Sequence, residues 1–326
     1  MTINTKQKRW SFILLLLGAI IILALYPLPA QDPIQYYDRE SGELKTEQVA
    51  AEKWLIWLYN NPVGKATLRA MVQRKLLSTV YGRMMDSPSS AKKIQPFIED
   101  FDIDMSAAQK QEFSSFNDFF TRKLKNNARP IDGDSTVAVS PADGKLMVYP
   151  DISNSDFIIK GYNFDIVSFL NDSELAQHYL DGTLVVIRLA PTDYHRFHFP
   201  ISGTLSSTTQ VKGHYLSVNP LALRKMTEIF CLNKREYTTI SNPLFGDLIM
   251  AEVGATMVGS ILQSYSGDLA TKGHEKGYFE FGGSTVVLLF EKGKISIDDD
   301  LVNNSLKGYE TAVKEGERIG TSLLIP

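Results

Sequence analysis

The chain has 326 residues, of which 44% are hydrophobic, and a formal net charge of -3 at pH 7. This length can bury one large hydrophobic core or two moderate ones, and the near balance of charge gives no general indication of nucleic-acid binding. The single cysteine, Cys231, excludes an internal disulfide framework and any zinc site built on cysteines.

The N-terminal segment contains an uncharged apolar stretch, residues 10–28, which has the length of a membrane-spanning helix. Trp10 and Tyr26 lie near its ends, where interfacial aromatic residues are common, and a basic tail of residues 1–9 precedes it. We therefore expect a single retained transmembrane anchor, with a cleaved signal peptide as the alternative. The positive-inside rule then places the tail in the cytoplasm and the main domain across the membrane.

The next two segments differ in composition. Residues 31–48 are polar and acidic and predict a linker, whereas residues 49–134 predict a helical, membrane-proximal region because apolar residues recur at three- and four-residue steps. Residues 51–93 hold eight Lys or Arg against only Glu52 and Asp86. This pattern favours docking on anionic lipid, but an ordinary helical subdomain with a solvated basic face explains it equally well.

Residues 135–326 predict a β-rich catalytic domain, because short runs of β-branched and aromatic residues alternate with Gly, Pro, Asn and Asp. Helical patterns return near residues 166–179 and 220–230. The expected fold class is α+β, with a helical N-terminal layer on a mixed or antiparallel β core, preceded by one transmembrane helix. Strands are predicted at residues 137–139, 146–149, 184–189, 205–211, 248–253, 257–262 and 286–290.

Ser284 follows Gly282 and Gly283 just before the predicted strand 286–290. Glycines permit backbone conformations that are closed to other residues, and a strained Gly–Ser peptide suits self-cleavage through attack of the serine hydroxyl on the preceding carbonyl. The same residues also suit an ordinary turn or bulge that leads into a strand.

Two other segments supply partner groups for a serine. A predicted turn presents Asp143, and the segment after strand 184–189 presents Asp193, His195 and His198. An Asp, a His and a Ser are the components of an activated-hydroxyl triad, but the residues alone do not choose between the two aspartates or between the two histidines. No Glu or Cys completes a familiar metal-ligand spacing with the histidines, so we expect no metal.

Six motifs occur in order along the chain and together strongly resemble the phosphatidylserine decarboxylase proenzymes, which are pyruvoyl-dependent and membrane-associated. The resemblance extends from about residue 35 to the C-terminus. The motifs are residues 116–130, the Ser-Pro-Ala-Asp-Gly-Lys turn 140–145, Tyr-His-Arg-Phe-His at 194–198, Tyr-Leu-Ser-Val-Asn-Pro at 215–220, residues 253–260, and Phe-Gly-Gly-Ser-Thr at 281–285.

The resemblance implies self-cleavage at Gly283 and Ser284. In this reading His198, oriented by Asp143, takes the proton of Ser284, which attacks the Gly283 carbonyl. β-Elimination then separates a β chain, residues 1–283, from an α chain, residues 284–326, and residue 284 becomes a covalent pyruvoyl group. This group is the implied cofactor for decarboxylation of phosphatidylserine to phosphatidylethanolamine and CO₂, and His195 is the implied acid that protonates the product carbanion.

The resemblance also implies partners and a location. Phosphatidylserine is the expected substrate, and membrane lipid is a further expected partner. The α and β chains of one precursor are expected to stay associated. We further expect a homodimer as one assembly, no nucleic-acid partner, and a bacterial cell membrane location with the membrane face left open.

Two other functions remain as alternatives. One is a membrane-anchored serine hydrolase that uses Ser284, His198 and Asp143, and the other is an inactive lipid-binding module. The chain also departs from the family pattern at Gly282, where many members have Leu, and at His274, where we expect Asp. Neither His274 nor Cys231 receives a role.

Overall fold

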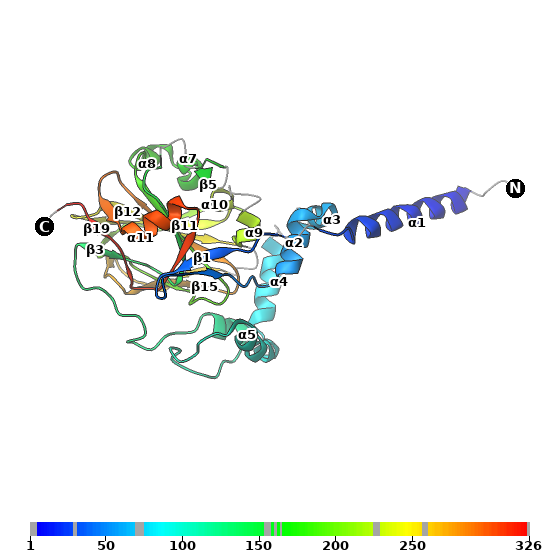
Figure 1. The fold of residues 1–326 in the computed structure, drawn as a ribbon, viewed down its shortest axis with the longest axis horizontal. Coiled ribbons are helices and arrows are strands. Elements are labelled where there is room, and N and C mark those ends of the chain that lie inside the picture. Colours follow the sequence, from blue (N-terminus) through cyan, green and yellow to red (C-terminus); the bar gives the residue numbers. More distant parts are fainter. Residues whose placement is uncertain are drawn as a thin grey trace.

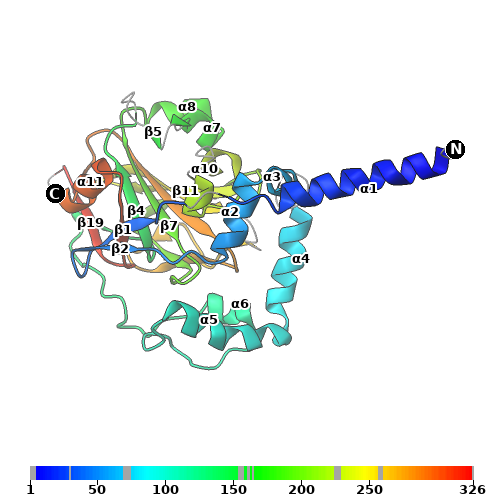
Figure 2. The same cartoon turned by 45° about the vertical axis from the view of Figure 1, so that its right-hand side comes forward.

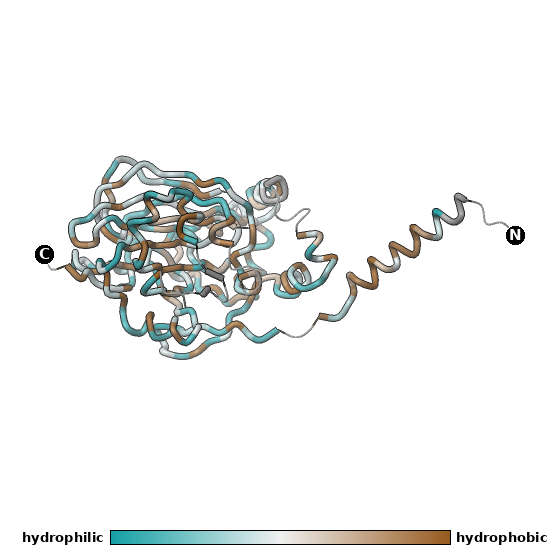
Figure 3. Tube along the Cα trace, turned by 90° about the horizontal axis from the view of Figure 1, so that it is seen from above, coloured by the Kyte–Doolittle hydropathy of each residue, from teal (hydrophilic) through white to brown (hydrophobic). Residues whose placement is uncertain are grey.

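The structure is a computed structural model that describes residues 5–28, 31–68, 75–152, 158–159, 162–163, 165–223, 229–255 and 260–324. Helix α1, Thr5–Ala24, extends away from a body built on a large sheet (Figure 1). Many of its apolar side chains are exposed, and Figure 3 shows the apolar character along most of the helix. Within the described ranges, no helix has both the length and the apolar character needed to cross a membrane, so the spanning helix predicted at 10–28 is not supported.

Residues 31–48, predicted to be a linker, instead add two strands to the edge of the main sheet. Strand β1, Gln35–Asp38, runs parallel to β18, Glu310–Val313, and antiparallel to β2, Glu43–Thr46. All four residues of β2 are exposed. An edge strand that faces water is polar, as a linker is, and this explains why composition alone gave the wrong interpretation.

The helical region predicted for residues 49–134 contains several helices. In Figure 2 the first three lie at the end of the body from which α1 extends, and the last two lie below the sheet. A second, smaller core forms around Phe116, Phe119 and Phe120, and Phe281 packs against it. This small core therefore joins the helical region to the segment that precedes Ser284. The helices are α2, Glu52–Asn60; α3, Pro62–Thr67; α4, Lys75–Asp86; the 3₁₀ helix η2, Pro88–Lys93; α5, Ile94–Phe101; and α6, Phe116–Phe120.

The main sheet has 11 strands in the order β14-β9-β11-β12-β16-β7-β4-β18-β1-β2, with β10 paired to β11. Its pairs are antiparallel except β1 with β18, which confirms the mixed or antiparallel β core of the predicted α+β fold. Its remaining strands are β4, Gly144–Tyr149; β7, Thr183–Leu189; β9, Gly203–Leu205; β10, Thr209–Val211; β11, Arg235–Asn242; β12, Gly246–Gly254; β14, Leu269–Ala270; and β16, Ser284–Phe290.

Smaller sheets and helices surround this sheet. Strands β13, Ile261–Gln263, β15, Glu275–Phe279, and β8, Arg196–His198, form one three-stranded sheet. Strands β17, Ile295–Ile297, β19, Arg318–Ser322, and β3, Val137–Val139, form another, and β5, Ile158–Ile159, pairs with β6, Tyr162–Asn163. The helices are α7, Ile166–Leu170; α8, Ser173–Gln177; α9, Pro220–Leu223; α10, Ile229–Leu232; and α11, Asp299–Leu306.

Strand β16 lies in the middle of the main sheet, between β12 and β7, and all seven of its residues are buried. A strand that is covered on both faces has a continuous apolar sequence rather than an alternating one, and Val286 to Phe290 has this sequence. The strand therefore gives its first residue, Ser284, a fixed position in the core.

Candidate active site

Ser284 is the first residue of β16 and lies between two neighbouring strands. It is in register with Gly254 of β12 on one side and Leu189 of β7 on the other. Its side chain is fully buried, and its Oγ has no hydrogen-bond partner among the described residues; the same holds for Oγ1 of Thr285. A buried hydroxyl without a partner costs free energy, so this Oγ is a candidate reactive group.

The two glycines before Ser284 have different structural requirements. Gly282 has a φ of +146°, a conformation that side chains with a Cβ rarely adopt. At Gly283, an added Cβ would lie 3.1 Å from Cγ2 of Val218 and 3.7 Å from Cβ of Ala255. A glycine at 283 therefore leaves its carbonyl carbon uncrowded, and the glycine at 282 accommodates the turn.

An apolar cavity of about 350 Å³ opens beside the same glycines. Its walls come from α2, from the end of β7 and from the segments around Val218 and Phe281. Among the described lining residues, Arg188 alone carries a charge, and it is held by ion pairs with Glu47 and Glu310. The cavity is lined by Ala50, Ala51, Trp54, Leu55, Leu58, Tyr59, Leu68, Tyr81, Arg188, Leu189, Ala190, Pro191, Ser217, Val218, Asn219, Phe281, Gly282 and Gly283.

His195 is fully buried, and its ring packs on Phe120 with a centroid distance of 3.8 Å. Its Nδ1 lies 2.9 Å from the carbonyl oxygen of Asp193. Because a carbonyl only accepts, Nδ1 carries the proton and Nε2 presents a lone pair, which has no partner in the described part of the chain. Burial lowers the pKa of His195 to about 3, so the ring is neutral at physiological pH.

His198 is held on both of its ring nitrogens. Its Nδ1–H donates to the carbonyl oxygen of Gly273 at 3.0 Å, and its Nε2 lies 3.2 Å from the hydroxyl of Tyr194, which donates to it. The carboxyl Oε1 of Glu315 lies 3.7 Å from Nδ1. Burial lowers the pKa of His198, so this ring also favours its neutral form.

Asp143 lies in the turn before β4, where Arg129 holds both of its carboxylate oxygens. Arg129 donates from Nε to Oδ1 at 2.9 Å and from Nη2 to Oδ2 at 2.5 Å. The backbone N–H of Glu315 donates to Oδ1 at 2.8 Å. Asp193, the alternative aspartate, instead forms an ion pair with Lys145 at 3.1 Å and accepts the N–H of Ala190 at 2.7 Å.

In the described ranges, the three residues of the predicted triad make no direct contact with one another. Asp143 and His198 both contact Glu315, but no hydrogen bond or ion pair joins Asp143 to His198 in the described ranges. Ser284 makes no described contact with either residue. The orienting group for His198 is the carbonyl of Gly273, and Tyr194 occupies its other nitrogen.

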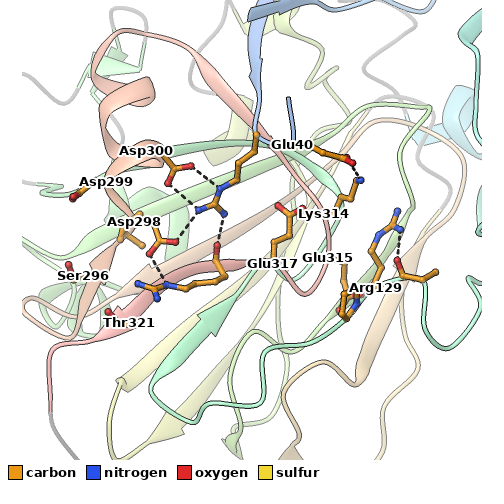
Figure 4. Close-up of a pocket in the computed structure, with 15 residues that line it drawn as sticks. Glu40, Arg129, Ser296, Asp298, Asp299, Asp300, Lys314, Glu315, Glu317 and Thr321 are labelled. Carbon is orange, nitrogen blue, oxygen red and sulfur yellow. Dashed lines mark hydrogen bonds and ion pairs between the residues drawn. The ribbon is translucent and has the colours of Figure 1, made fainter. Parts of the chain in front are cut away.

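Glu315 and Arg129 also line one end of a polar groove of about 940 Å³. Figure 4 shows Arg129 and Glu315 on one side of the groove and Asp298 and Asp300 on the other. Arg39 donates to both of these aspartates. Glu315 is 4% exposed, and burial together with the charge of Asp143 raises its pKa to about 8.

Sequence reasoning gave no role to Arg129, Tyr194 or Glu315. Arg129 and Tyr194 lie within two of the motifs quoted above, so motif membership was a usable signal for them. Glu315 lies outside all six motifs and more than 100 positions from His198 in the sequence, so no local pattern pointed to it.

Comparison with known proteins identifies one matching family model and several similar proteins. A model of the family described as phosphatidylserine decarboxylase matches residues 116–321. A phosphatidylserine decarboxylase proenzyme of Fusobacterium nucleatum is 49% identical over 293 residues, which cover 89% of this chain and 98% of that protein. Proenzymes of the same name from Clostridium botulinum and Clostridium kluyveri are 49% and 47% identical over 291 residues, which cover 88% of this chain and 99% and 98% of those proteins.

Proposed function

This chain belongs to the phosphatidylserine decarboxylase family, and we propose that it is a self-processing proenzyme whose processed form converts phosphatidylserine to phosphatidylethanolamine and CO₂. One observation carries the proposal for the cleavage site. The buried hydroxyl of Ser284 lies without a hydrogen-bond partner among the described residues, directly after a glycine pair and at the start of a central strand.

Self-cleavage in this proposal begins at the Ser284 hydroxyl. Its proton passes to a histidine, and Oγ attacks the carbonyl carbon of Gly283, so that a C–O bond forms and the C–N bond of the peptide breaks with proton transfer to the nitrogen. Loss of the Cα proton of residue 284 then expels the carboxylate of Gly283. The resulting dehydroalanine takes up water and releases ammonia, which leaves a pyruvoyl group on residues 284–326.

The surroundings of residue 284 suit such a group. A pyruvoyl group supplies a ketone that binds the primary amine of the substrate and withdraws electrons as CO₂ leaves. The apolar cavity beside Gly283 has room for part of a substrate, and its mostly apolar lining would limit the access of water to the reacting atoms. His195 holds its Nδ1 proton on the Asp193 carbonyl, so its Nε2 must first take up a proton before it can act as an acid.

Membrane association is part of the proposal, because phosphatidylserine is a membrane lipid. Helix α1 supports it through exposed side chains such as Trp10, Leu15 and Ile22, which are 65%, 74% and 70% exposed. Large exposed apolar surfaces are typical of membrane or protein interaction sites. The indole of Trp57 and the amide of Asn61 donate to the last carbonyls of α1, so the helix is fixed to the wall of the cavity.

A serine hydrolase is less well supported. The matching family model and the relatives named above are described as phosphatidylserine decarboxylases rather than as hydrolases. A hydrolase would also keep an intact chain and react with a fluorophosphonate probe.

Denaturing mass spectrometry of the purified full chain tests the proposal. We expect two chains that meet at 283/284, with a pyruvoyl group at the N-terminus of the smaller one, and release of CO₂ from phosphatidylserine in detergent micelles. Ser284→Ala should remain whole and inactive, whereas Ser89→Ala, at an exposed site, should be cleaved normally. A wild-type chain that stays whole would refute self-processing.

A further inference from the structure

Glu315 is a buried carboxyl group to which the cleavage chemistry above assigns no role. It follows β18 on the proposed α chain, and only 4% of its surface is exposed. Its Oε1 has no hydrogen-bond partner among the described residues. Its backbone is fixed, because its N–H donates to Oδ1 of Asp143 at 2.8 Å. A carboxyl that is buried without a partner costs stability, which suggests a functional reason for its position.

The carboxyl of Glu315 faces the ring of His198. Its Oε1 lies 3.7 Å from Nδ1 of His198. Among the described residues, no other carboxylate lies within ion-pair distance of this ring. Asp143 is committed elsewhere, since Arg129 donates to both of its oxygens. Glu315 therefore occupies the position relative to His198 that the resemblance assigns to Asp143.

Other polar and charged groups surround this pair, and all of those named here except Glu317 bind another side chain. Glu275, across the β8–β15 ladder, is bound by Arg196 at 2.9 and 3.0 Å. The Tyr194 hydroxyl contacts the far nitrogen of His198, and Arg129 and Asp143 bind each other. Glu317 lies on the same turn as Glu315, and its buried Oε2 has no hydrogen-bond partner among the described residues, but it makes no described contact with His198.

We propose that Glu315 is a positioning residue for self-cleavage, whose ionised carboxyl stabilises the imidazolium that His198 becomes when it takes the Ser284 proton. This inference rests on the proposed function. The proton moves from Oγ of Ser284 to Nε2 of His198 after Tyr194 has released that nitrogen, and Nδ1 keeps its proton throughout. The new positive charge is then 3.7 Å from Oε1 of Glu315, where an opposite charge favours the ionised carboxyl.

The inference predicts how cleavage depends on pH. Because burial and Asp143 raise the pKa of Glu315 to about 8, the carboxyl is protonated at neutral pH while His198 is neutral. Cleavage should accelerate as Glu315 ionises, so the rate should rise with an apparent pKa near that of Glu315. A plot of reaction rate against pH shows the pKa of a group whose charge acts in the reaction, whereas a purely structural group gives no such pKa.

The test follows cleavage of the full chain after cell-free synthesis, by denaturing gel and mass spectrometry from about pH 6 to 9. Wild type should show the rising limb. At the alkaline end of the range, Glu315→Gln should cleave roughly tenfold more slowly than wild type, because a neutral amide cannot offset the imidazolium charge. Its cleavage rate should not rise with pH. Glu317→Gln is the matched control, and it should retain the wild-type profile.

The outcomes separate the inference from the function on which it rests. A Glu315→Gln profile that matches wild type, or an equal loss in Glu317→Gln, overturns the role of Glu315 while cleavage itself stands. A wild-type chain that forms no pyruvoyl group removes the proposed function as well. If Glu315→Gln does not fold, Glu315→Asp provides the test, because it keeps a carboxyl group. Its cleavage rate should still rise with pH. A cleavage rate that does not change with pH in a folded Glu315→Asp variant refutes the inference.

Discussion

Arg129 holds Asp143 through two parallel hydrogen bonds, from Nε at 2.9 Å and from Nη2 at 2.5 Å, with only 18% and 12% of the two side chains exposed. Paired donors of this kind fix the position and orientation of a carboxylate. Asp143 in turn holds the backbone of Glu315. The aspartate therefore anchors the turn that carries Glu315, and it makes no hydrogen bond to a histidine among the described residues.

Replacing Arg129 by Met should destabilise the protein by about 2–4 kcal/mol, because the Asp143 carboxylate would remain buried without its partner. Urea unfolding in the Ser284→Ala background measures this without interference from cleavage. Arg318→Met is the control, since Arg318 is 51% exposed in its ion pair with Asp298 and its loss should cost less than about 1 kcal/mol. Equal losses in the two variants would contradict the prediction.

The raised pKa of Glu315 predicts a stability that falls as pH rises. Below pH 4.5, its ordinary pKa, the carboxyl is protonated in both the folded and the unfolded chain. Between 4.5 and about 8 the unfolded chain releases this proton while the folded chain keeps it, so folding loses stability across this window. In the Ser284→Ala background, Glu315→Gln should flatten this decline in thermal melts. Parallel curves for the parent and the variant would show that Glu315 titrates normally.

Lys276 and Glu252 form a fully buried ion pair with Nζ–O distances of 2.9 and 2.8 Å, and Gln263 bonds to both residues. Burial raises the pKa of Glu252 even with the lysine against it. Lys276→Met should cost about 3–5 kcal/mol in free energy of unfolding, because it leaves a buried carboxylate unpaired. The double variant Lys276→Met/Glu252→Gln should recover much of this loss, and a double variant no more stable than the single one would contradict the explanation.

Asn61 connects helix α1 to the body of the protein. Its Nδ2 donates to the carbonyl of Leu23 at 2.7 Å, while its Oδ1 caps α3 by accepting the N–H of Val63 at 2.9 Å. Asn61→Ala should therefore cost about 1–3 kcal/mol and release α1, measured as faster proteolysis within residues 25–28. Asn60→Ala is the control, because in the described part of the chain the Asn60 side chain donates to the Ile56 carbonyl of its own helix. Equal cleavage rates in the two variants would show that Asn61 does not hold α1.

The sequence predicted well those elements whose structure depends on neighbouring residues in the chain. The run Val286 to Phe290 is apolar because both faces of β16 are covered, and the two glycines before Ser284 reflect the backbone of the turn. The two strands in residues 31–48 were missed, because an exposed edge strand and a linker have the same polar composition.

The contacts of the candidate site depend on the fold and have no local signal. His198 is oriented by the carbonyl of Gly273, a backbone group that no side-chain pattern can indicate. Glu315 reaches the same ring from the other end of the domain, because β18 pairs with β4, which follows the Asp143 turn. The sequence proposed Ser284, His198 and Asp143 as a triad, which stays a prediction, whereas the observed partners of His198 and Asp143 depend on the sheet topology.

The central place of β16 has a consequence for how the protein recovers from denaturation. Cleavage before Ser284 would leave β16 hydrogen-bonded between β12 and β7, so the two chains would share one sheet and one core. The uncleaved precursor can refold as a single molecule. The cleaved form, once unfolded, would have to reassemble from two separate molecules at a rate that depends on their concentration. After processing, the folded state would therefore persist because the protein unfolds slowly, and not because the two separated chains refold readily.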